Sequence, residues 1–247
     1  MYSVINAGDE LHFGPIGLSE DSENGPDVYT IVYKDIACVV SESPIKEWDI
    51  SRKNMMKHQE VNELVMHDFV TLPIKFCTIA EDKEQIIEKF LKSRYDEFRE
   101  RLDYFSDKGE YGVKALWIQM EKVFAEIMEE NPKLKEWRER LEKLLFDKAR
   151  NDMIILGQKV KEALGKKKES FESELFEYLK PFAVEAKTND LMGDRMALNG
   201  AFLISQATQK NFDDQINKMS EEYRDNMQFK YVGPTPPANF IEIVVDW

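Results

Sequence analysis

The hydrophobic residues of this chain switch between two spacings, one typical of strands and one typical of helices, and this switching is the strongest constraint on its fold. The first clear case is the stretch "VYTIVYKDIACVVSES", which is rich in β-branched residues. It predicts a hairpin with strands at residues 28–33 and 36–41 and a turn at Lys34 and Asp35. The chain therefore begins with a sheet.

Helical spacing takes over after the hairpin. Ser51 is expected to cap a helix, because side-chain oxygens of this kind accept the free N–H groups of a first turn. A short strand at residues 72–77 should follow, and Thr78 and Glu81 then form a Thr-x-x-Glu capping box that predicts the start of a second helix. The apolar stripes of the two helices are Val61, Leu64, Val65 and Phe69, and then Ile87, Phe90, Leu91, Phe98, Leu102 and Phe105.

The second half begins with "YGVKALWIQ", which predicts a strand. Asn131 and Pro132 should interrupt the helix that follows, and further helix is expected to about residue 180, with a solvated break at Gly165 and the basic run 166–168. The helical stripe here is Leu134, Trp137, Leu141, Leu144 and Leu145. The remaining elements are strands at 182–187, 201–205 and 227–232, and a helix carrying Phe212, Ile216, Met219 and Tyr223.

This order predicts an α+β protein of two domains. Residues 1–109 should form an N-terminal α+β domain, and the segment Asp107 to Gly109 is the candidate boundary. Residues 110–247 have the order β-α-β-β-α-β, which predicts a modified ferredoxin-like domain with a long helical insertion and a C-terminal extension.

Composition limits the partners. Acidic residues outnumber basic ones 47 to 34 and the net charge is −13, so a nucleic-acid partner is not expected. No apolar run approaches the roughly 20 residues of a membrane span, so no membrane partner is expected either. The start "MYSVINAGDE" lacks the pattern of a secretory signal, and Cys38 and Cys77 fit free thiols in strands of a cytoplasmic protein.

The stretch "HQEVNELVMHDFVTLPIKFCTI" concentrates the residue types that bind metals or act as nucleophiles. On one helix, His58 and His67 lie about 180° apart, so they cannot share a metal. His58 falls on the apolar face and is expected to be a hydrogen-bonded scaffold residue, and Cys77 a small buried hydrophobe. No recognised catalytic, metal or nucleotide-binding motif occurs, so no catalytic, cofactor-binding or metal-binding residue is predicted.

The C-terminal stretch "YVGPTPPANFIEIVVDW" predicts a last strand with one apolar face. Such a strand can cross back over its own domain, or it can offer an edge to another chain. A mixed arrangement is expected, in which Phe240 and Ile241 anchor the segment to the second domain and the rest presents an edge. The candidate partner-binding residues are Phe240, Ile241, Ile243, Val245 and Trp247.

Four blocks of the chain, in order, resemble the gas vesicle protein F and L family: "HQEVNELVMHDFVTLPIKFCTI", "GEYGVKALW", "LNGAFLI" and "YVGPTPPANF". The family pattern has a His-led helix running into a Leu-Pro-x-x-Phe-Gly-Thr strand, and it closes with Gly-Pro-x-Pro-Pro-Tyr-x-Phe. The resemblance spans nearly the whole chain. Cys77 stands where the family has Gly, and Ala238 stands where it often has an aromatic residue.

The resemblance implies a non-catalytic accessory protein of gas vesicle assembly, cytoplasmic and associated with the vesicle. It would bind the hydrophobic shell protein and other gas vesicle accessory proteins, and self-association is possible. Two alternatives stay open. One is a small-molecule enzyme or sensor with His58 and Cys77 facing a cleft between the domains, and the other is a ferredoxin-like regulatory module that binds a metabolite.

Overall fold

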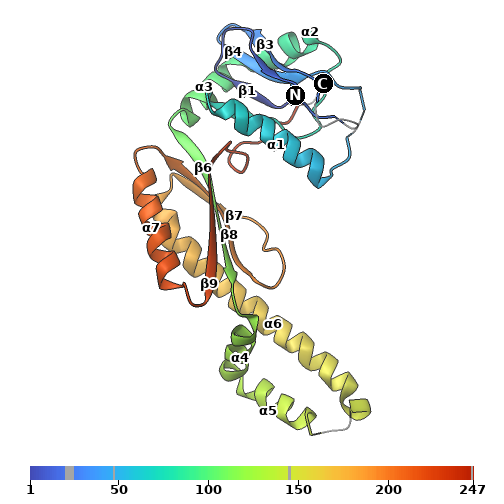
Figure 1. Ribbon diagram of the computed structural model, residues 1–247, viewed down its shortest axis with the longest axis vertical. Helices are drawn as coiled ribbons and strands as arrows, with labels where there is room; N and C mark the ends of the chain where they lie inside the picture. Colours follow the sequence, from blue (N-terminus) through green and yellow to red (C-terminus); the bar gives the residue numbers. More distant parts are fainter. Residues whose placement is uncertain (20–24, 47, 144–145, 246) are drawn as a thin grey trace. The chain divides into compact units, whose positions relative to one another are not determined.

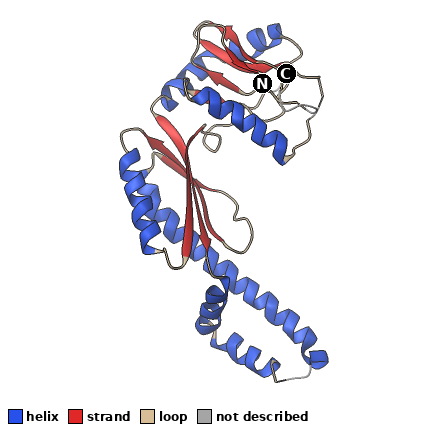
Figure 2. Ribbon diagram, in the orientation of Figure 1, coloured by secondary structure: helices blue, strands red, loops and turns tan. Residues whose placement is uncertain are grey.

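The structure is a computed structural model that describes residues 1–19, 25–46, 48–143, 146–245 and 247 (Figures 1 and 2). It is a mixed helix and sheet protein with two antiparallel sheets. The chain forms two compact units, residues 1–110 together with 233–247, and residues 111–232. This division differs from the predicted domains at the C-terminal end, because residues 233–247 pack with the first unit and not with the second.

The first unit is built on a five-stranded sheet with the order β2-β3-β4-β1-β5. Every pairing in it is antiparallel. The predicted hairpin is confirmed, since β3 and β4 pair across the turn at Lys34, whose φ is 56°. The strands are β1 (Ser3–Ile5), β2 (His12–Gly14), β3 (Val28–Tyr33), β4 (Ile36–Ser41) and β5 (Thr71–Pro73).

Helices contact both faces of this sheet (Figure 1). Helix α1 (Arg52–Met66) is capped by Ser51 as predicted, and its Val61 and Val65 pack against Ile5 and Val39. The predicted second helix is divided into α2 (Lys83–Gln85), the π-helical η1 (Ile86–Leu91) and α3 (Tyr95–Phe105). The last two contact the strands through buried Phe90, Phe98 and Leu102.

The capping box predicted at Thr78 and Glu81 is wrong. The helix begins at Lys83, and its cap is Asp82, whose side chain accepts a hydrogen bond from the backbone N–H of Gln85. The hydroxyl of Thr78 instead donates to the carbonyl of Lys75 at 2.7 Å. Thr78 therefore stabilises the preceding turn, and Asp82 caps the helix.

The second unit has a four-stranded sheet with the order β7-β8-β6-β9. Its strands are β6 (Lys108–Trp117), β7 (Glu185–Thr188), β8 (Met196–Ser205) and β9 (Met227–Thr235). Helices α6 (Phe146–Leu179) and α7 (Gln209–Glu222) share one core with this sheet, in which Phe202 and Phe212 are fully buried (Figure 1). Helices α4 (Met120–Glu130) and α5 (Pro132–Leu141) meet at Pro132, as predicted.

The break predicted at Gly165 is wrong, because α6 runs through this position without interruption. Two observations account for its continuity. Leu164, Leu175 and Leu179 are buried in the core of the unit, and the ammonium group of Lys167 pairs with Glu126 and Glu130 of α4 at 3.1 and 2.6 Å. Packing and these ion pairs outweigh the weak helical propensity of one glycine. Leu144 and Leu145 of the predicted stripe lie outside the described residues.

The predicted C-terminal strand is also largely wrong. Within residues 236–245 and at 247, only Ile243 pairs as a strand would, in an isolated parallel bridge to Ile74.

None of the described helices combines the length and apolar character needed to cross a membrane.

A matched pair of glycine substitutions tests the continuity of α6. A Cβ added to Gly165 meets no atom within 4 Å, whereas one added to Gly200 lies 2.6 Å from the ring of buried Phe202. We expect Gly165→Ala to raise the free energy of unfolding by about 1 kcal/mol, and Gly200→Ala to lower it by about 1–3 kcal/mol. Urea unfolding measures both. A destabilising Gly165→Ala would contradict a helical conformation at this position.

Candidate binding surface

The end of the chain is fixed to the first unit by buried groups. Ile241 is 4% exposed and Ile243 is fully buried. The carbonyl of Ile243 accepts a hydrogen bond from the backbone N–H of Lys75 at 3.2 Å, just beyond the edge strand β5. These two of the predicted partner-binding residues are therefore buried by their own chain. Ile241 belongs to the first unit, and not to the second domain as predicted.

A buried carboxylate holds the segment further upstream. Glu110 is 6% exposed, and its two carboxylate oxygens accept hydrogen bonds from the backbone N–H and the side-chain amide of Asn239. Thr235 donates to the carbonyl of Glu110 at 3.3 Å. Three hydrogen bonds to one residue fix the position at which the chain returns to the first unit.

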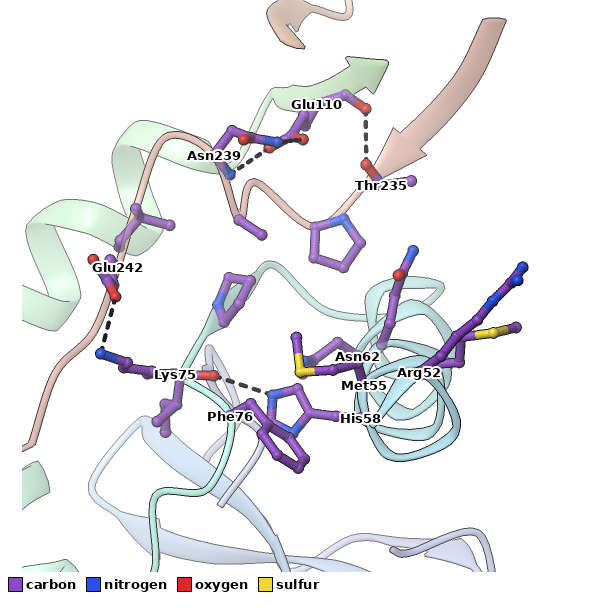
Figure 3. Close-up of a pocket in the computed structure, with 17 residues that line it drawn as sticks. Arg52, Met55, His58, Asn62, Lys75, Phe76, Glu110, Thr235, Asn239 and Glu242 are labelled. Carbon is purple, nitrogen blue, oxygen red and sulfur yellow. Dashed lines mark hydrogen bonds and ion pairs between the residues drawn. The ribbon is translucent and has the colours of Figure 1, made fainter. Parts of the chain in front are cut away.

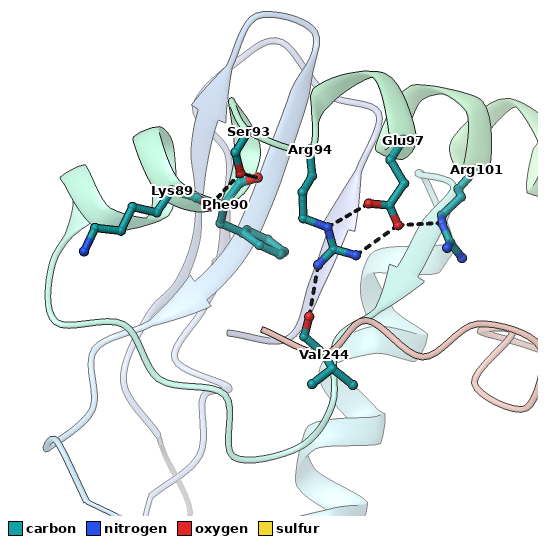
Figure 4. A network of polar contacts seen from close by, with 7 residues as sticks. All are labelled: Lys89, Phe90, Ser93, Arg94, Glu97, Arg101 and Val244. Carbon is teal, nitrogen blue, oxygen red and sulfur yellow. Dashed lines mark hydrogen bonds and ion pairs between the residues drawn. The ribbon is translucent and has the colours of Figure 1, made fainter. Parts of the chain in front are cut away.

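Arg94, the N-cap residue of α3, binds both the C-terminal segment and Glu97 (Figure 4). Its Nη1 donates to the carbonyl of Val244 at 3.0 Å, while its Nε and Nη2 contact the two oxygens of Glu97 at 2.8 and 2.9 Å. Arg101 contacts Glu97 at 3.0 Å. Hydrogen bonds from Arg94 hold the pKa of Glu97 below its usual value, so the carboxylate stays ionised and orients the guanidinium toward Val244.

Trp247 contacts the first unit through its indole N–H and its ring. Its indole N–H donates to the carbonyl of Ile79 at 2.7 Å, and its ring centroid lies 6.5 Å from that of Phe90. The residue is nevertheless 45% exposed, as is Val244. These two residues are therefore held in place while part of their apolar surface faces solvent.

The exposed residues border a hollow of about 480 Å³, here named the C-terminal groove. Ile45 on its border is 73% exposed. The described lining contains no His, Asp or Glu. The groove is lined by Ile45, Lys46, Lys75, Phe76, Cys77, Thr78, Ile79, Val244, Val245 and Trp247.

Cys77 lies in a turn and not in a strand, which corrects the prediction. Its φ is 68°, in the left-handed region that favours glycine, and its sulfur accepts a hydrogen bond from the backbone N–H of Trp48 at 3.2 Å. The thiol is partly exposed, unlike that of Cys38, which is fully buried and whose pKa burial raises to about 12. The backbone conformation explains why glycine suits this position in the family pattern.

His58 is a packed scaffold residue of the first unit, as predicted. Its Nε2 donates to the carbonyl of Ile74 at 3.1 Å, and its ring lies 5.2 Å from that of Tyr2 and 5.6 Å from that of Phe76. Burial lowers its pKa to about 4, so it is neutral at pH 7. His67 is exposed at the end of α1, and no group of three potential metal ligands occurs within the described part of the chain.

His58 and Cys77 do not face one hollow. His58 lines a separate pocket of about 430 Å³ between α1, residues 73–76 and the C-terminal segment (Figure 3). Cys77 lines the C-terminal groove, and among the described lining residues the two hollows share Lys75 and Phe76. The sequence did not single out Arg94 or Glu110, because a polar residue in an amphipathic pattern carries no signal for a partner more than a hundred residues away.

The comparison with known proteins identifies the family. Residues 1–242 match the family model for the gas vesicle synthesis protein GvpL/GvpF. The chain belongs to this family. It is 27% identical over 218 residues to gas vesicle protein F of a Nostoc species, covering 87% of this chain and 88% of that protein. It is 25% identical over 239 residues to gas vesicle protein L of Haloferax mediterranei, covering 86% and 70%.

Solved structures agree with the family assignment. The crystal structure of gas vesicle protein GvpF from an Anabaena species superposes with a TM-score of 0.74 at 25% identity, covering 99% of this chain and 98% of that one. GvpF from Microcystis aeruginosa gives a TM-score of 0.69 at 22% identity, which supports the fold. The GvpL/GvpF chain described here therefore has an accessory role in the gas vesicle system.

The pH dependence of stability tests the environment of His58. Because its folded-state pKa of about 4 lies below the ordinary 6.5, the unfolded state binds more protons between these values. Stabilisation present above pH 6.5 is thus lost as the pH falls toward 4, by at most about 1.4 kcal/mol per pH unit. We expect His58→Gln to cost about 1 kcal/mol at pH 7.5, and this deficit should shrink below pH 6.5.

Urea unfolding at a series of pH values measures this difference between the two proteins. His67→Gln, at the exposed end of the same helix, is the matched control and should change little. A His58→Gln deficit that stays constant from pH 7.5 to 4.5 would contradict a buried neutral imidazole.

The left-handed turn predicts an order of stability at position 77. Cys77→Gly removes the strain of a side chain at positive φ, although it also removes the acceptor of the Trp48 N–H. Cys77→Ala loses the acceptor and keeps the strain, and Cys77→Val adds a β-branched side chain. We expect the glycine variant to be about 1 kcal/mol more stable than the alanine variant, with valine lowest. Thermal melting of the three proteins decides the order, and alanine above glycine would refute it.

Proposed function

We propose that this member of the GvpL/GvpF family is a non-catalytic, cytoplasmic accessory protein that binds the hydrophobic shell protein and other gas vesicle proteins during vesicle assembly. The C-terminal groove is the binding surface. The observation that supports it most is the exposed apolar surface of Val244 and Trp247, on a segment that hydrogen bonds hold in place. The exposed Ile45 lines the same groove. Val245 and Trp247 then contact the partner, whereas Ile241, Ile243 and Phe240 anchor the segment.

Binding an apolar shell subunit requires the combination of apolar surface and charge that this chain has. An apolar shell subunit must be bound without aggregation, so its carrier needs apolar surface in one place and charge elsewhere. The net charge of −13 supplies the second property.

We further propose that the second unit is a ferredoxin-like domain. The order β6, helices, β7, β8, α7, β9 along the chain and β7-β8-β6-β9 across the sheet supports it. The helices α4 and α5 and the first half of α6 then form an insertion, which has a small apolar cluster of its own around Leu141 and Leu156.

Lysine substitutions at the groove test the binding surface. Ile45→Lys and Val244→Lys place a charge where the partner buries apolar area, and one such side chain contributes about 1.5–3 kcal/mol when buried. We expect each variant to bind purified shell protein at least about tenfold more weakly in a co-sedimentation assay, with an unchanged melting temperature.

Met192→Lys is the matched control, because Met192 of the second unit is 75% exposed and Ile45 is 73% exposed. Deleting residues 239–247 is a poorer test, since it also removes the buried isoleucines and the partner of Glu110. Light scattering separates binding to the shell protein from self-association. Wild-type affinity in both Ile45→Lys and Val244→Lys would refute the groove as the binding surface.

A further inference from the structure

Strands β6 and β9 are antiparallel neighbours in the sheet of the second unit, and one hydrogen bond fixes their register. The backbone N–H of Ile118 donates to the carbonyl of Asn226 at 2.9 Å, so these two residues lie opposite each other. Counting four residues back along β6 and four forward along β9 places Lys114 opposite Lys230. The ends of the two strands agree with this register.

Both lysines lie on the face of the sheet that α6 and α7 do not cover (Figure 1). The residues before and after each lysine pack in the core shared with these helices: Val113, Ala115, Phe229 and Tyr231. Side chains alternate between the two faces of a strand, so Lys114 and Lys230 point away from this core. Both are exposed.

The two lysines are a like-charge pair without a counter-charge. Residues directly opposite on neighbouring strands have Cβ atoms about 4.5–5.5 Å apart, and like charges there are unfavourable. Neither Lys114 nor Lys230 forms an ion pair with a described residue, whereas Lys167 of the same unit pairs with Glu126 and Glu130. Acidic residues outnumber basic ones 47 to 34 in this chain. A positive pair without a carboxylate in so acidic a chain points to negative charge supplied by another molecule.

Apolar side chains flank the lysine pair on both sides. Val232 and Leu116 lie on the same face, each two residues from the pair and in opposite directions. Two residues along a strand span about 7 Å. Val232 is 62% exposed, and Ile118, which lies beyond Leu116, is 43% exposed. The surface here named the lysine face consists of Lys114, Leu116, Ile118, Lys230 and Val232.

We propose that the lysine face binds a protein partner that presents a carboxylate between apolar side chains. The two ammonium groups share the carboxylate, whose two oxygens accept from both and whose charge relieves the repulsion between them. The lysine face belongs to the second unit and the C-terminal groove to the first. The inference therefore does not depend on the function proposed for the groove.

Two properties of the chain favour a protein partner over other anions. The net charge of −13 repels a polyanion such as nucleic acid at long range. A small inorganic anion would leave the exposed surface of Val232 and Ile118 uncovered. A carboxylate between apolar side chains covers the whole face.

Methyl NMR of the full chain with labelled isoleucine and valine tests the proposal, using the blocked peptide acetyl-Leu-Ser-Glu-Ser-Leu-amide as the probe. When extended, it repeats the apolar, acidic, apolar order at about 7 Å spacing. We expect saturable shifts of the Val232 and Ile118 methyl signals, while Ile154, 55% exposed on α6, does not move. The peptide with glutamine in place of glutamate should bind at least about threefold more weakly, and the peptide with lysine weaker still.

Charge reversal at one lysine separates binding from folding. Lys114→Glu or Lys230→Glu replaces the like-charge pair by an opposite-charge pair across the strands, so each should raise the melting temperature by up to about 4 °C. Each should also weaken binding of the glutamate peptide at least about tenfold. Lys218→Glu on α7 is the matched control, because it makes the same charge change at an exposed lysine on the covered side of the sheet, and it should leave binding unchanged.

Several results would overturn the proposal: no saturable shifts up to the solubility limit of the peptide, equal binding of the lysine peptide, or full binding by either charge-reversal variant. The same shifts with sodium phosphate alone at matched ionic strength would show a simple anion site. Shifts that depend on protein concentration without peptide would assign the face to a second copy of the chain. Tighter binding of a single-stranded oligonucleotide, with the same dependence on both lysines, would assign it to nucleic acid. Each of these three outcomes also contradicts the proposal.

Discussion

The return of the chain to its first unit is the contact on which both hollows depend. Ile243 is fully buried and lies beside Ile74, at the end of the edge strand β5. Burying one such side chain contributes about 1.5–3 kcal/mol, which is enough to fix the segment once Glu110 and Arg94 hold its neighbours. Without this segment, the C-terminal groove loses one wall and the pocket lined by His58 loses another.

The contact between Ile243 and residues 74 and 75 also covers part of the sheet edge next to β5. A strand edge with free N–H and C=O groups is a site of uncontrolled pairing, and proteins shield such edges. Here β5 ends at Pro73, which has no N–H, and the next residues pair with Tyr2 and Ile243 through Ile74 and Lys75. The apolar surface that stays exposed is therefore on side chains and not on an unpaired strand.

Local elements were predictable and long-range contacts were not. The hairpin, the cap at Ser51 and the helix boundary at Pro132 follow from residues within a few positions of one another. Thr78 was misassigned because two hydroxyl or carboxylate caps compete within five residues, and the hydrogen bond to Lys75 decides between them. The hydrogen-bonded scaffold role of His58 was predictable from its helix face, but the unpaired side-chain oxygen of Asn62 was not.

The C-terminal segment shows how a correct pattern can be assigned to the wrong side. Alternation at residues 241, 243 and 245 predicted an apolar row, and the structure turns Ile241 and Ile243 of that row inward. Val244, between them and Trp247, keeps exposed apolar surface because Arg94 binds its carbonyl and leaves its side chain outside (Figure 4). The alternation of side chains along an extended segment defines two faces, and the position of the core decides which of them is buried. The exposure of the Val244 side chain thus depends on a hydrogen bond to its backbone carbonyl, which no pattern of side chains in the sequence records.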